Sequence, residues 1–212
     1  MNIMNTENNK DIFFPAGTAE VNIIPVMQGE EQMKVESGDL PDTLPILALR
    51  NAVLFPGMVY PVTIGRQKSI TLIKEAEKRD SFIGAVPQVD VTVEDPTEKD
   101  LYEYGTVSRV MKVLEMPDGT ITAIIQGVKR LRMDGVLSYE PYITARVKYI
   151  EDIIPENDNS TKMIAESLKE KAAVIIKSSS IAPKEAVGAL KSIDNYAFLV
   201  NFIATTVEIE NF

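Results

Sequence analysis

Residues 44–66, LPILALRNAVLFPGMVYPVTIGR, carry the pattern from which the fold of this chain is predicted. The mostly apolar run Leu44–Leu49 predicts a β-strand. Asn51–Met58 follows as a turn region that contains Phe-Pro-Gly, and Val59–Ile64 predicts a second strand that Gly65 ends. No catalytic motif lies in this stretch, so we expect it to build the fold and, in its apolar turn, to bind.

The chain after this stretch is predicted to form one helix and then several strands. Arg66–Arg79 places Ile70, Ile73 and Ala76 on one face, which is typical of an amphipathic helix. The strands predicted after it are Phe82–Pro87, Tyr104–Glu115, Thr120–Gln126, Val128–Met133 and Tyr142–Ile154.

Glycines interrupt these strands at short intervals. Asp118-Gly119 predicts a hairpin turn, and Gly127 predicts a bend or a bulge. Seven glycines lie in the strand-rich region, at positions 57, 65, 84, 105, 119, 127 and 135. We therefore expect an α+β fold in which a strongly bent sheet closes into a partly open β-barrel with one inserted helix.

Helical periodicity replaces the strand pattern after residue 155. Asn157–Ser160 is a cluster of capping residues, and the apolar stripe behind it consists of Ile164, Leu168, Ala172 and Ile175. Pro183 predicts the start of a second helix, and Asp194 predicts the cap of a third. The third helix has few charges, so we expect a partner to cover it and further helix to follow Phe212.

Charge divides the chain into an acidic part and a nearly neutral part. The net charge is −9, and residues 1–43 alone contribute −6. We predict a flexible acidic arm over 1–43, a strand-rich domain over 44–154 and a helical subdomain over 155–212. Clustered Lys and Arg are missing, so we do not expect nucleic-acid binding. No apolar run reaches the length of a membrane span, and no signal-peptide pattern opens the chain, which favours a cytoplasmic protein without membrane contact.

The residue types that are missing exclude several kinds of catalytic site. The chain has no Cys and no His, which removes Ser-His-Asp and Cys-His chemistry and the usual zinc sites. A phosphate loop would need a glycine where Gln67 stands, so Gly65–Ser69 is predicted to be the first turn of the helix. Ser and Lys are plentiful, but no local pattern marks a Ser–Lys pair.

Two charged clusters have simpler interpretations than a binding site. A carboxylate-only site for Mg²⁺ or Ca²⁺ stays open in principle, but the acidic loop lacks the Asp/Asn alternation and turn glycine of a cation site; its acids are Glu94, Asp95, Glu98 and Asp100. A basic patch could bind RNA, but few aromatic residues accompany it; its members are Arg109, Lys112, Lys129, Arg130 and Arg132. We favour a solvated loop and a salt-bridged face.

The apolar residues around the first turn are the candidate binding site. They are Leu54, Phe55, Pro56, Met58 and Tyr60. Part of this set can equally be plain core. An apolar rim that carries a methionine also suits the binding of unfolded chains of varied sequence, and we predict this role for it. We predict no catalytic, cofactor-binding or metal-binding residue in this chain.

Residues 44–58 closely resemble the opening of the N-terminal, substrate-binding domain of bacterial Lon proteases. The resemblance continues through Pro61–Arg66 and Lys68–Ile70, and again at Tyr104–Val107 and Gln126–Arg130. The segment Asn195–Ile203 is similar to the later helical part of that family. The resemblance covers about residues 44–205, and the acidic arm lies outside it.

The resemblance implies a PUA-like barrel followed by a helical subdomain. It further implies an ATP-dependent serine protease, hexameric when whole, that degrades misfolded and short-lived regulatory proteins in protein quality control and the stress response. ATP, Mg²⁺ and the protease site would belong to other parts of that protein, and this domain would bind unfolded or degron-bearing substrates and help assembly. Two alternatives stay open: a stand-alone adaptor of the same fold, and an RNA-binding PUA-like barrel.

Overall fold

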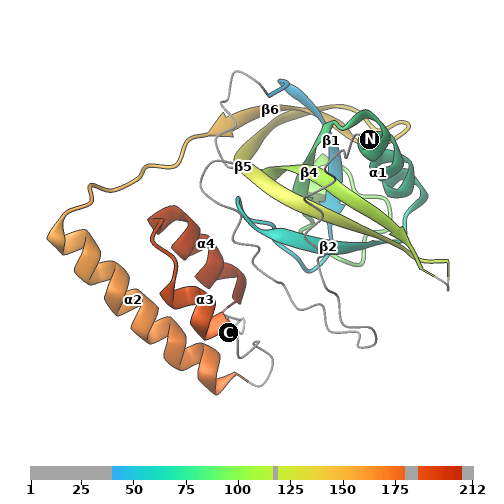
Figure 1. Cartoon of the computed structure of the whole chain (residues 1–212). Coiled ribbons are helices and arrows are strands. Elements are labelled where there is room, and N and C mark those ends of the chain that lie inside the picture. Colours follow the sequence, from blue (N-terminus) through green and yellow to red (C-terminus); the bar gives the residue numbers. More distant parts are fainter. Residues whose placement is uncertain (1–39, 117–118, 180–185, 207–212) are drawn as a thin grey trace, which may run out of the picture.

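The structure is a computed structural model that describes residues 40–116, 119–179 and 186–206. Its strands are β1 (Thr43–Leu49), β2 (Val59–Ile64), β3 (Phe82–Pro87), β4 (Tyr104–Glu115), β5 (Ile121–Ser138) and β6 (Thr144–Ile150). Its helices are α1 (Gln67–Arg79), the short 3-10 helix η3 (Glu98–Asp100), α2 (Asn159–Ser178), α3 (Ala186–Lys191) and α4 (Tyr196–Thr206). Figure 1 shows the strands and α1 on one side and α2, α3 and α4 on the other.

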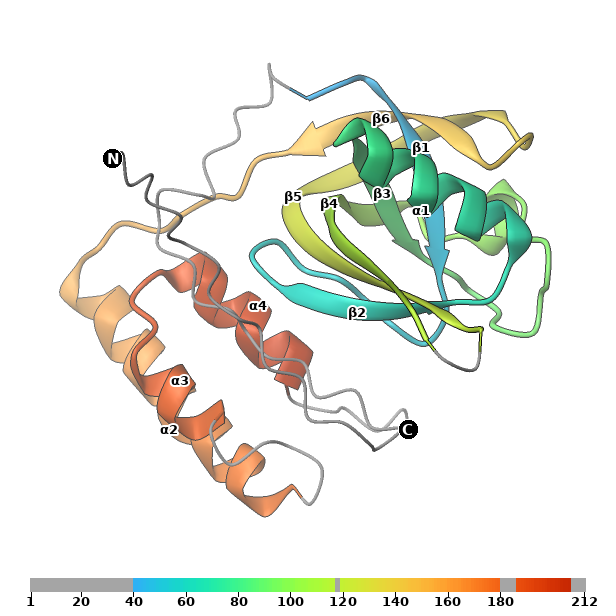
Figure 2. The ribbon, with the colours of Figure 1, turned by 45° about the vertical axis from the view of Figure 1, so that its right-hand side comes forward.

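The six strands form one sheet in the order β2-β5-β4-β3-β1-β6. A further pairing joins β6 to β5, so the strand order closes on itself. β5 makes this possible because it is 18 residues long: its first half pairs with β2 and its second half with β6. All pairs are antiparallel except β1–β3. The expected mixed α+β fold is confirmed, and Figure 2 shows the sheet curling around its interior.

Gly127 lies at an irregularity of the sheet, as its sequence context predicts. The register between β4 and β5 shifts between Val107 and Ser108, which leaves one extra residue on β5 beside this glycine. A Cβ atom on Gly127 would lie 2.3 Å from the carbonyl oxygen of Phe55. Only glycine allows the turn before β2 to approach β5 this closely.

The boundaries of the folded part differ from those predicted at two places. The predicted arm ends at residue 43, but Leu40 is buried, and the carbonyl oxygen of Asp42 accepts a hydrogen bond from Val147 N at 2.9 Å. Residues 40–43 are therefore held against β6, and the earlier part of the arm lies outside the described residues. The last strand ends at Ile150 rather than Ile154, and residues 151–158 are exposed without regular structure.

The interior holds two apolar clusters. The larger cluster joins α1, the strands β1, β2, β3 and β5, and the C-terminal helices, and it includes Leu49, Met58, Leu72 and Phe202. The smaller lies between β1, β4, β5 and β6. Helix α1 buries Leu72, Ile73 and Ala76, in agreement with the predicted apolar face. At an order of 25 cal/mol per Å² of buried apolar surface, these clusters are the main source of stability.

The C-terminal helices pack differently from the prediction. The face that α2 buries consists of Ala165, Ala172, Ala173 and Ile176. The predicted stripe is therefore wrong in part: Ile164 is 66% exposed and Ile175 is 49% exposed. Small alanines allow α3 and α4 to pack closely on that face, which turns the larger branched residues outward.

Helix α4 is capped and covered within the chain. Asn195, not Asp194, caps it, because its Oδ1 accepts a hydrogen bond from Phe198 N at 2.9 Å. Its apolar face is buried through Phe198, Leu199 and Phe202. The described part of the chain therefore covers this helix, for which the sequence predicts a partner. The cap of α2 lies within the predicted cluster 157–160: it is Asp158, which accepts from Thr161 N at 2.7 Å. Pro183 lies outside the described residues. No helix among the described residues is long and apolar enough to cross a membrane.

Candidate functional site

The turn between β1 and β2, residues 50–58, holds the predicted site residues in a fixed backbone path. Asn51 and Gly57 adopt positive φ angles of 49° and 82°. The carbonyl oxygen of Leu54 accepts a hydrogen bond from Thr106 Oγ1 at 2.6 Å, and Gly57 N donates to Gly127 O at 2.9 Å. The turn is therefore attached to β4 and β5 on its inner side.

The predicted site residues lie mainly inside the molecule. Leu54 is 3% exposed, Met58 is 1% exposed and Pro56 is buried, while Phe55 and Tyr60 are half-buried. For Leu54, Pro56 and Met58 the expectation of an exposed rim is wrong, because all three belong to a turn that the sheet and α4 enclose. Exposed apolar surface at this turn comes from Val53 instead. A role of the five residues in substrate binding stays a prediction.

Helix α4 is attached to this turn through one buried side chain. Asn201 is 2% exposed; its Nδ2 donates to Pro56 O at 3.1 Å, and its Oδ1 accepts from Arg130 Nη2 at 2.5 Å. Arg130 also forms an ion pair with Asp152 at the start of the linker to α2. In both ribbon views α4 lies toward the sheet, and α2 lies on the far side of the three helices. Asn201 therefore joins the sheet, the turn and α4 in one polar contact.

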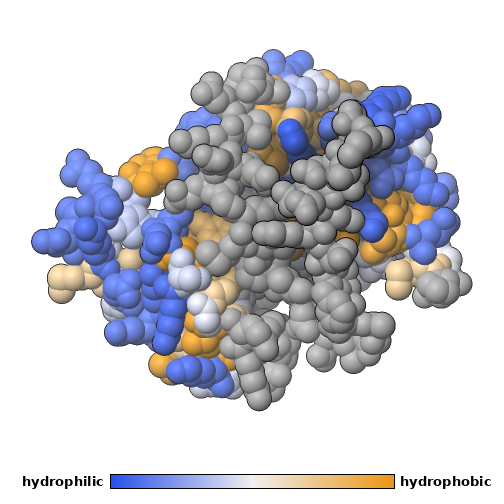
Figure 3. All heavy atoms as spheres, viewed as in Figure 1, coloured by the Kyte–Doolittle hydropathy of each residue, from blue (hydrophilic) through white to orange (hydrophobic). Residues whose placement is uncertain are grey.

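Apolar surface is also exposed on the C-terminal helices. Figure 3 shows apolar patches set among polar residues over this part of the molecule. On α2 the exposed apolar residues are Met163, Ile164, Val174 and Ile175, and the linker before it adds Ile153 and Ile154. Exposed apolar side chains on one helix face are candidates for contact with another chain.

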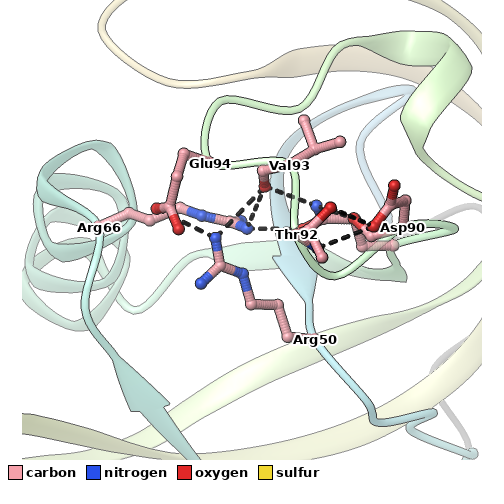
Figure 4. Close-up of polar contacts among 7 residues, drawn as sticks. Arg50, Arg66, Asp90, Thr92, Val93 and Glu94 are labelled. Carbon is pink, nitrogen blue, oxygen red and sulfur yellow. Dashed lines mark hydrogen bonds and ion pairs between the residues drawn. The ribbon is translucent and has the colours of Figure 1, made fainter.

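A second feature is an open hollow of about 450 Å³ beside the carboxyl ends of β1 and β2. Its lining includes Leu47–Arg50, Ala52, Tyr60–Arg66, Ser69 and Glu94. Figure 4 shows Arg50 and Arg66 converging on the loop 90–94. Arg50 Nη2 lies 3.1 Å from Glu94 Oε2, and both arginines donate to Val93 O, at 3.3 Å and 3.2 Å. The hollow thus combines apolar walls with two cations.

Arg66 is the more restricted of the two arginines. Its Nη2 donates to Gln88 Oε1 at 2.6 Å, and its Nε is buried with no hydrogen-bond partner among the described residues. Burial lowers the pKa of Arg66, and the nearby charge of Arg50 lowers it further, while Glu94 and Asp95 act in the opposite direction. The site is therefore one where added negative charge is favourable.

The two charged clusters of the sequence are engaged in ion pairs and caps. In the acidic loop, Asp95 pairs with Lys68 at 3.3 Å, and Asp100 accepts from Thr97 Oγ1 at 2.7 Å. On the sheet, Lys129 pairs with Glu151 at 2.5 Å, and Arg132 pairs with Glu103 at 3.7 Å. The predicted salt-bridged face is therefore confirmed for Lys129, Arg130 and Arg132, whereas Arg109 lies over the Phe82 ring instead. No group of three or more acidic residues that could hold a metal ion occurs in the described part of the chain.

Sequence reasoning missed two of these features, although each leaves a signal. Arg50 and Arg66 each follow the end of a predicted strand within two residues, which is a signal that could have placed both side chains at the ends of neighbouring strands. Asn201 is a single amide in an otherwise apolar helical segment, which indicates a buried polar contact. Neither signal identifies the residues that these side chains contact, because the contacted residues lie in segments distant in the sequence.

The sequence and the structure were compared with known proteins. A family model described as the ATP-dependent protease La (LON) substrate-binding domain matches residues 43–212. A Lon protease of Flavobacterium johnsoniae is 44% identical over 192 residues, which are 90% of this chain and 24% of that protein. A Lon protease of Porphyromonas gingivalis is 34% identical over 92% of this chain and 23% of that protein.

Solved structures agree on the fold. The N-terminal domain of the Mycobacterium avium complex Lon protease superposes with a TM-score of 0.56 at 16% identity, over 75% of this chain and 80% of that one. A Lon N-terminal domain protein from Xanthomonas campestris gives a TM-score of 0.50 over 78% of this chain and 99% of that one. This chain belongs to the family of the ATP-dependent protease La (LON) substrate-binding domain.

Proposed function

We propose that this chain recognises unfolded or degron-bearing proteins on behalf of an ATP-dependent protease. The observation that carries the proposal is the match of residues 43–212 to the substrate-binding domain family. The chain spans about a quarter of the length of the curated relatives it matches, at 24% of the Flavobacterium johnsoniae protein. The activity of a whole protein is therefore part of the proposal.

The proposed whole protein is a cytoplasmic serine protease, hexameric, that uses ATP and Mg²⁺ to degrade misfolded and short-lived regulatory proteins in quality control and the stress response. This chain would supply recognition and help in assembly. Gln67 stands where a phosphate loop needs a glycine, so we assign nucleotide binding to residues outside this chain. The stand-alone adaptor and the RNA-binding barrel are not favoured by the family match or by the paired basic residues.

We infer further that the fold is a PUA-like, partly open barrel joined to a C-terminal helical subdomain. The closing pairing of β6 with β5 supports the barrel. The linker 151–158 is exposed and has no regular structure, which supports a separate helical unit.

Binding to one copy is expected to be weak, and six copies in a ring would strengthen it. Exposed apolar residues that suit such binding include Val53 at the turn and the outer face of α2. Leu54 and Met58 would contribute only when α4 moves away from the turn, because both are buried in the closed arrangement. The predicted site of Leu54, Phe55, Pro56, Met58 and Tyr60 is thus proposed as a site that α4 covers.

The test uses the 212-residue chain and one model protein in two forms. Reduced, alkylated α-lactalbumin is permanently unfolded, and native α-lactalbumin is its matched control. We expect saturable binding of the unfolded form by fluorescence anisotropy and at least about tenfold weaker binding of the native form, which corresponds to 1.4 kcal/mol. Equal binding of both forms, or binding of neither, would contradict the proposal.

A matched pair of variants tests whether the turn takes part. Val53 and Val89 are each 53% exposed, and only Val53 lies in the turn. Val53→Asp is expected to weaken binding of the unfolded protein severalfold, and Val89→Asp to leave it unchanged. Substituting Met58 by Asp is a poorer test, because a charge in the core would unfold the domain.

A further inference from the structure

The hollow beside β1 and β2 has the composition of a site for a negatively charged group with an apolar neighbour. Tyr60 and Val62, which are both half-buried, contribute apolar surface to its lining. Arg50 and Arg66 contribute the positive charge, and Ser69 adds a hydroxyl from the first turn of α1. Polar and apolar surface line the hollow about equally, and polar groups set among apolar ones orient a ligand in a pocket.

Two arginines and one acidic residue line the hollow, and Asp95 acts on Arg66 from outside this lining. Glu94 is the one acidic residue in its lining, and it pairs with Arg50 through a side chain that is 81% exposed. The groups that accept hydrogen bonds from Arg66 are the neutral Gln88 amide and Val93 carbonyl, and its Nε is buried without a partner. The Glu94 carboxylate thus pairs with Arg50 and is exposed enough to move into solvent. An incoming carboxylate could take the same place and bind Arg66 as well.

The hollow also adjoins a free strand edge. β2 pairs with β5 and with no other strand in the described part of the chain. It carries Pro61, which has no N–H and is typical of an edge strand. Arg66 follows the carboxyl end of β2, and Arg50 directly follows β1. An extended chain laid along the β2 edge would therefore reach the two arginines where the edge ends.

We propose that this hollow binds the free C-terminal carboxylate of an extended polypeptide whose last side chain is apolar, with Arg50 and Arg66 holding the carboxylate. The inference rests on the proposed function, since it names one feature by which protein substrates are recognised. We choose a chain terminus as the occupant because the two arginines lie beyond the ends of β1 and β2, so an extended chain along the β2 edge would present its last residue to them. Glu94 competes with the incoming carboxylate for Arg50.

The experiment measures binding of fluorescent eight-residue peptides to the 212-residue chain by anisotropy at low salt. The first peptide ends in leucine with a free carboxylate. The second has the same sequence with a C-terminal amide, and the third is the amide with one internal glutamate. We expect the free acid to bind at least about tenfold more tightly than either amide, the range for a charge-assisted hydrogen bond. Added salt should reduce this difference.

Variants separate the proposed contacts from general charge effects. R50Q and R66Q should each remove most of the preference for the free acid. R79Q is the matched control, since Arg79 is exposed at the far end of α1 and pairs with Glu75. Because Arg66 also holds the loop through Gln88 and Val93, R66Q could loosen the loop, and E94Q supplies the independent test. E94Q leaves those bonds in place and should tighten binding of the free acid severalfold, whereas E98Q on the same loop should not.

Three results would overturn the inference. They are equal affinities for the acid and amide peptides, an internal-glutamate amide that binds as tightly as the free acid, and E94Q without effect on binding. If unfolded α-lactalbumin still binds under any of these results, the proposed function stands and only this inference fails. If neither the peptides nor the unfolded protein bind, both fail.

Discussion

Removing the amide of Asn201 should release α4 from the sheet while leaving the sheet folded. Asn201→Ala deletes the donor to Pro56 O and the acceptor of Arg130 Nη2. The buried Pro56 carbonyl is then left without a partner, at a cost of about 1–2 kcal/mol. The Arg130 side chain is 31% exposed and keeps Asp152, so solvent reduces its loss to about 0.5–1 kcal/mol. We expect α4 docking to weaken by about 1.5–3 kcal/mol in total.

Native-state hydrogen exchange measures this effect element by element. A loss of about 1.5–3 kcal/mol corresponds to roughly ten- to hundredfold faster exchange of α4 amides. Amides of β4 and β5 should change little, because their ladder does not depend on α4. Asn159→Ala, at an exposed position at the start of α2, is the matched control and should change stability by less than about 0.5 kcal/mol. Unchanged α4 protection, or an equal loss in α4 and the strands, would refute the reasoning.

Three further predictions concern packing and pH. Gly127→Ala should lower the free energy of unfolding in urea by about 1–3 kcal/mol, because the added Cβ would lie 2.3 Å from a carbonyl oxygen. Gly188→Ala in α3 should raise it by about 0.5–1 kcal/mol, because the added Cβ meets nothing within 4 Å. Similar effects of the two substitutions would contradict this reasoning. Burial raises the pKa of Tyr149 from 10.0 to about 12, so the stability that neutral Tyr149 contributes is present below pH 10 and is lost as pH rises toward 12. Tyr149→Phe should therefore make the free energy of unfolding fall less steeply between pH 10 and 12, and an unchanged slope would contradict this prediction. The hydrogen bonds from Thr161 lower the pKa of Asp158 below 3.8, so its stabilising effect is present above that value and is lost as pH falls through the lowered pKa; Asp158→Ala should reduce α2 helicity by circular dichroism at pH 7 and progressively less below pH 3.8, and an equal loss at pH 2 would argue against the cap.

Local patterns predict most of the elements in this chain. β2, β3 and β4 have the bounds that their apolar runs and turn residues indicate, and α1 begins one residue after the predicted start. The irregularity beside Gly127 was also predicted, and the cap of α2 falls within the predicted cluster 157–160. These features depend on backbone conformation and on neighbours a few residues away, which is information that a single sequence contains.

The burial of the candidate site could not be predicted in the same way. An apolar turn such as Leu54–Met58 has the same composition whether solvent or another element covers it. Here α4 covers it from more than 140 residues away, through the hydrogen bond from Asn201 to Pro56. The outward face of α2 was mistaken for the same reason, since its amphipathic pattern contains two apolar stripes and packing chooses between them.

The amino-acid sequence alone settles the absence of Cys and His, the acidic balance, the strand and helix segments and the resemblance to the Lon family. Tertiary structure alone decides that Arg50 and Arg66 share one hollow with Glu94, and that Asn201 closes α4 over the turn. The physical reason is how far apart along the sequence the interacting residues lie. Secondary structure follows from steric and hydrophobic periodicity along the chain, whereas a site forms where distant segments meet, and the register of the closed sheet sets those meetings.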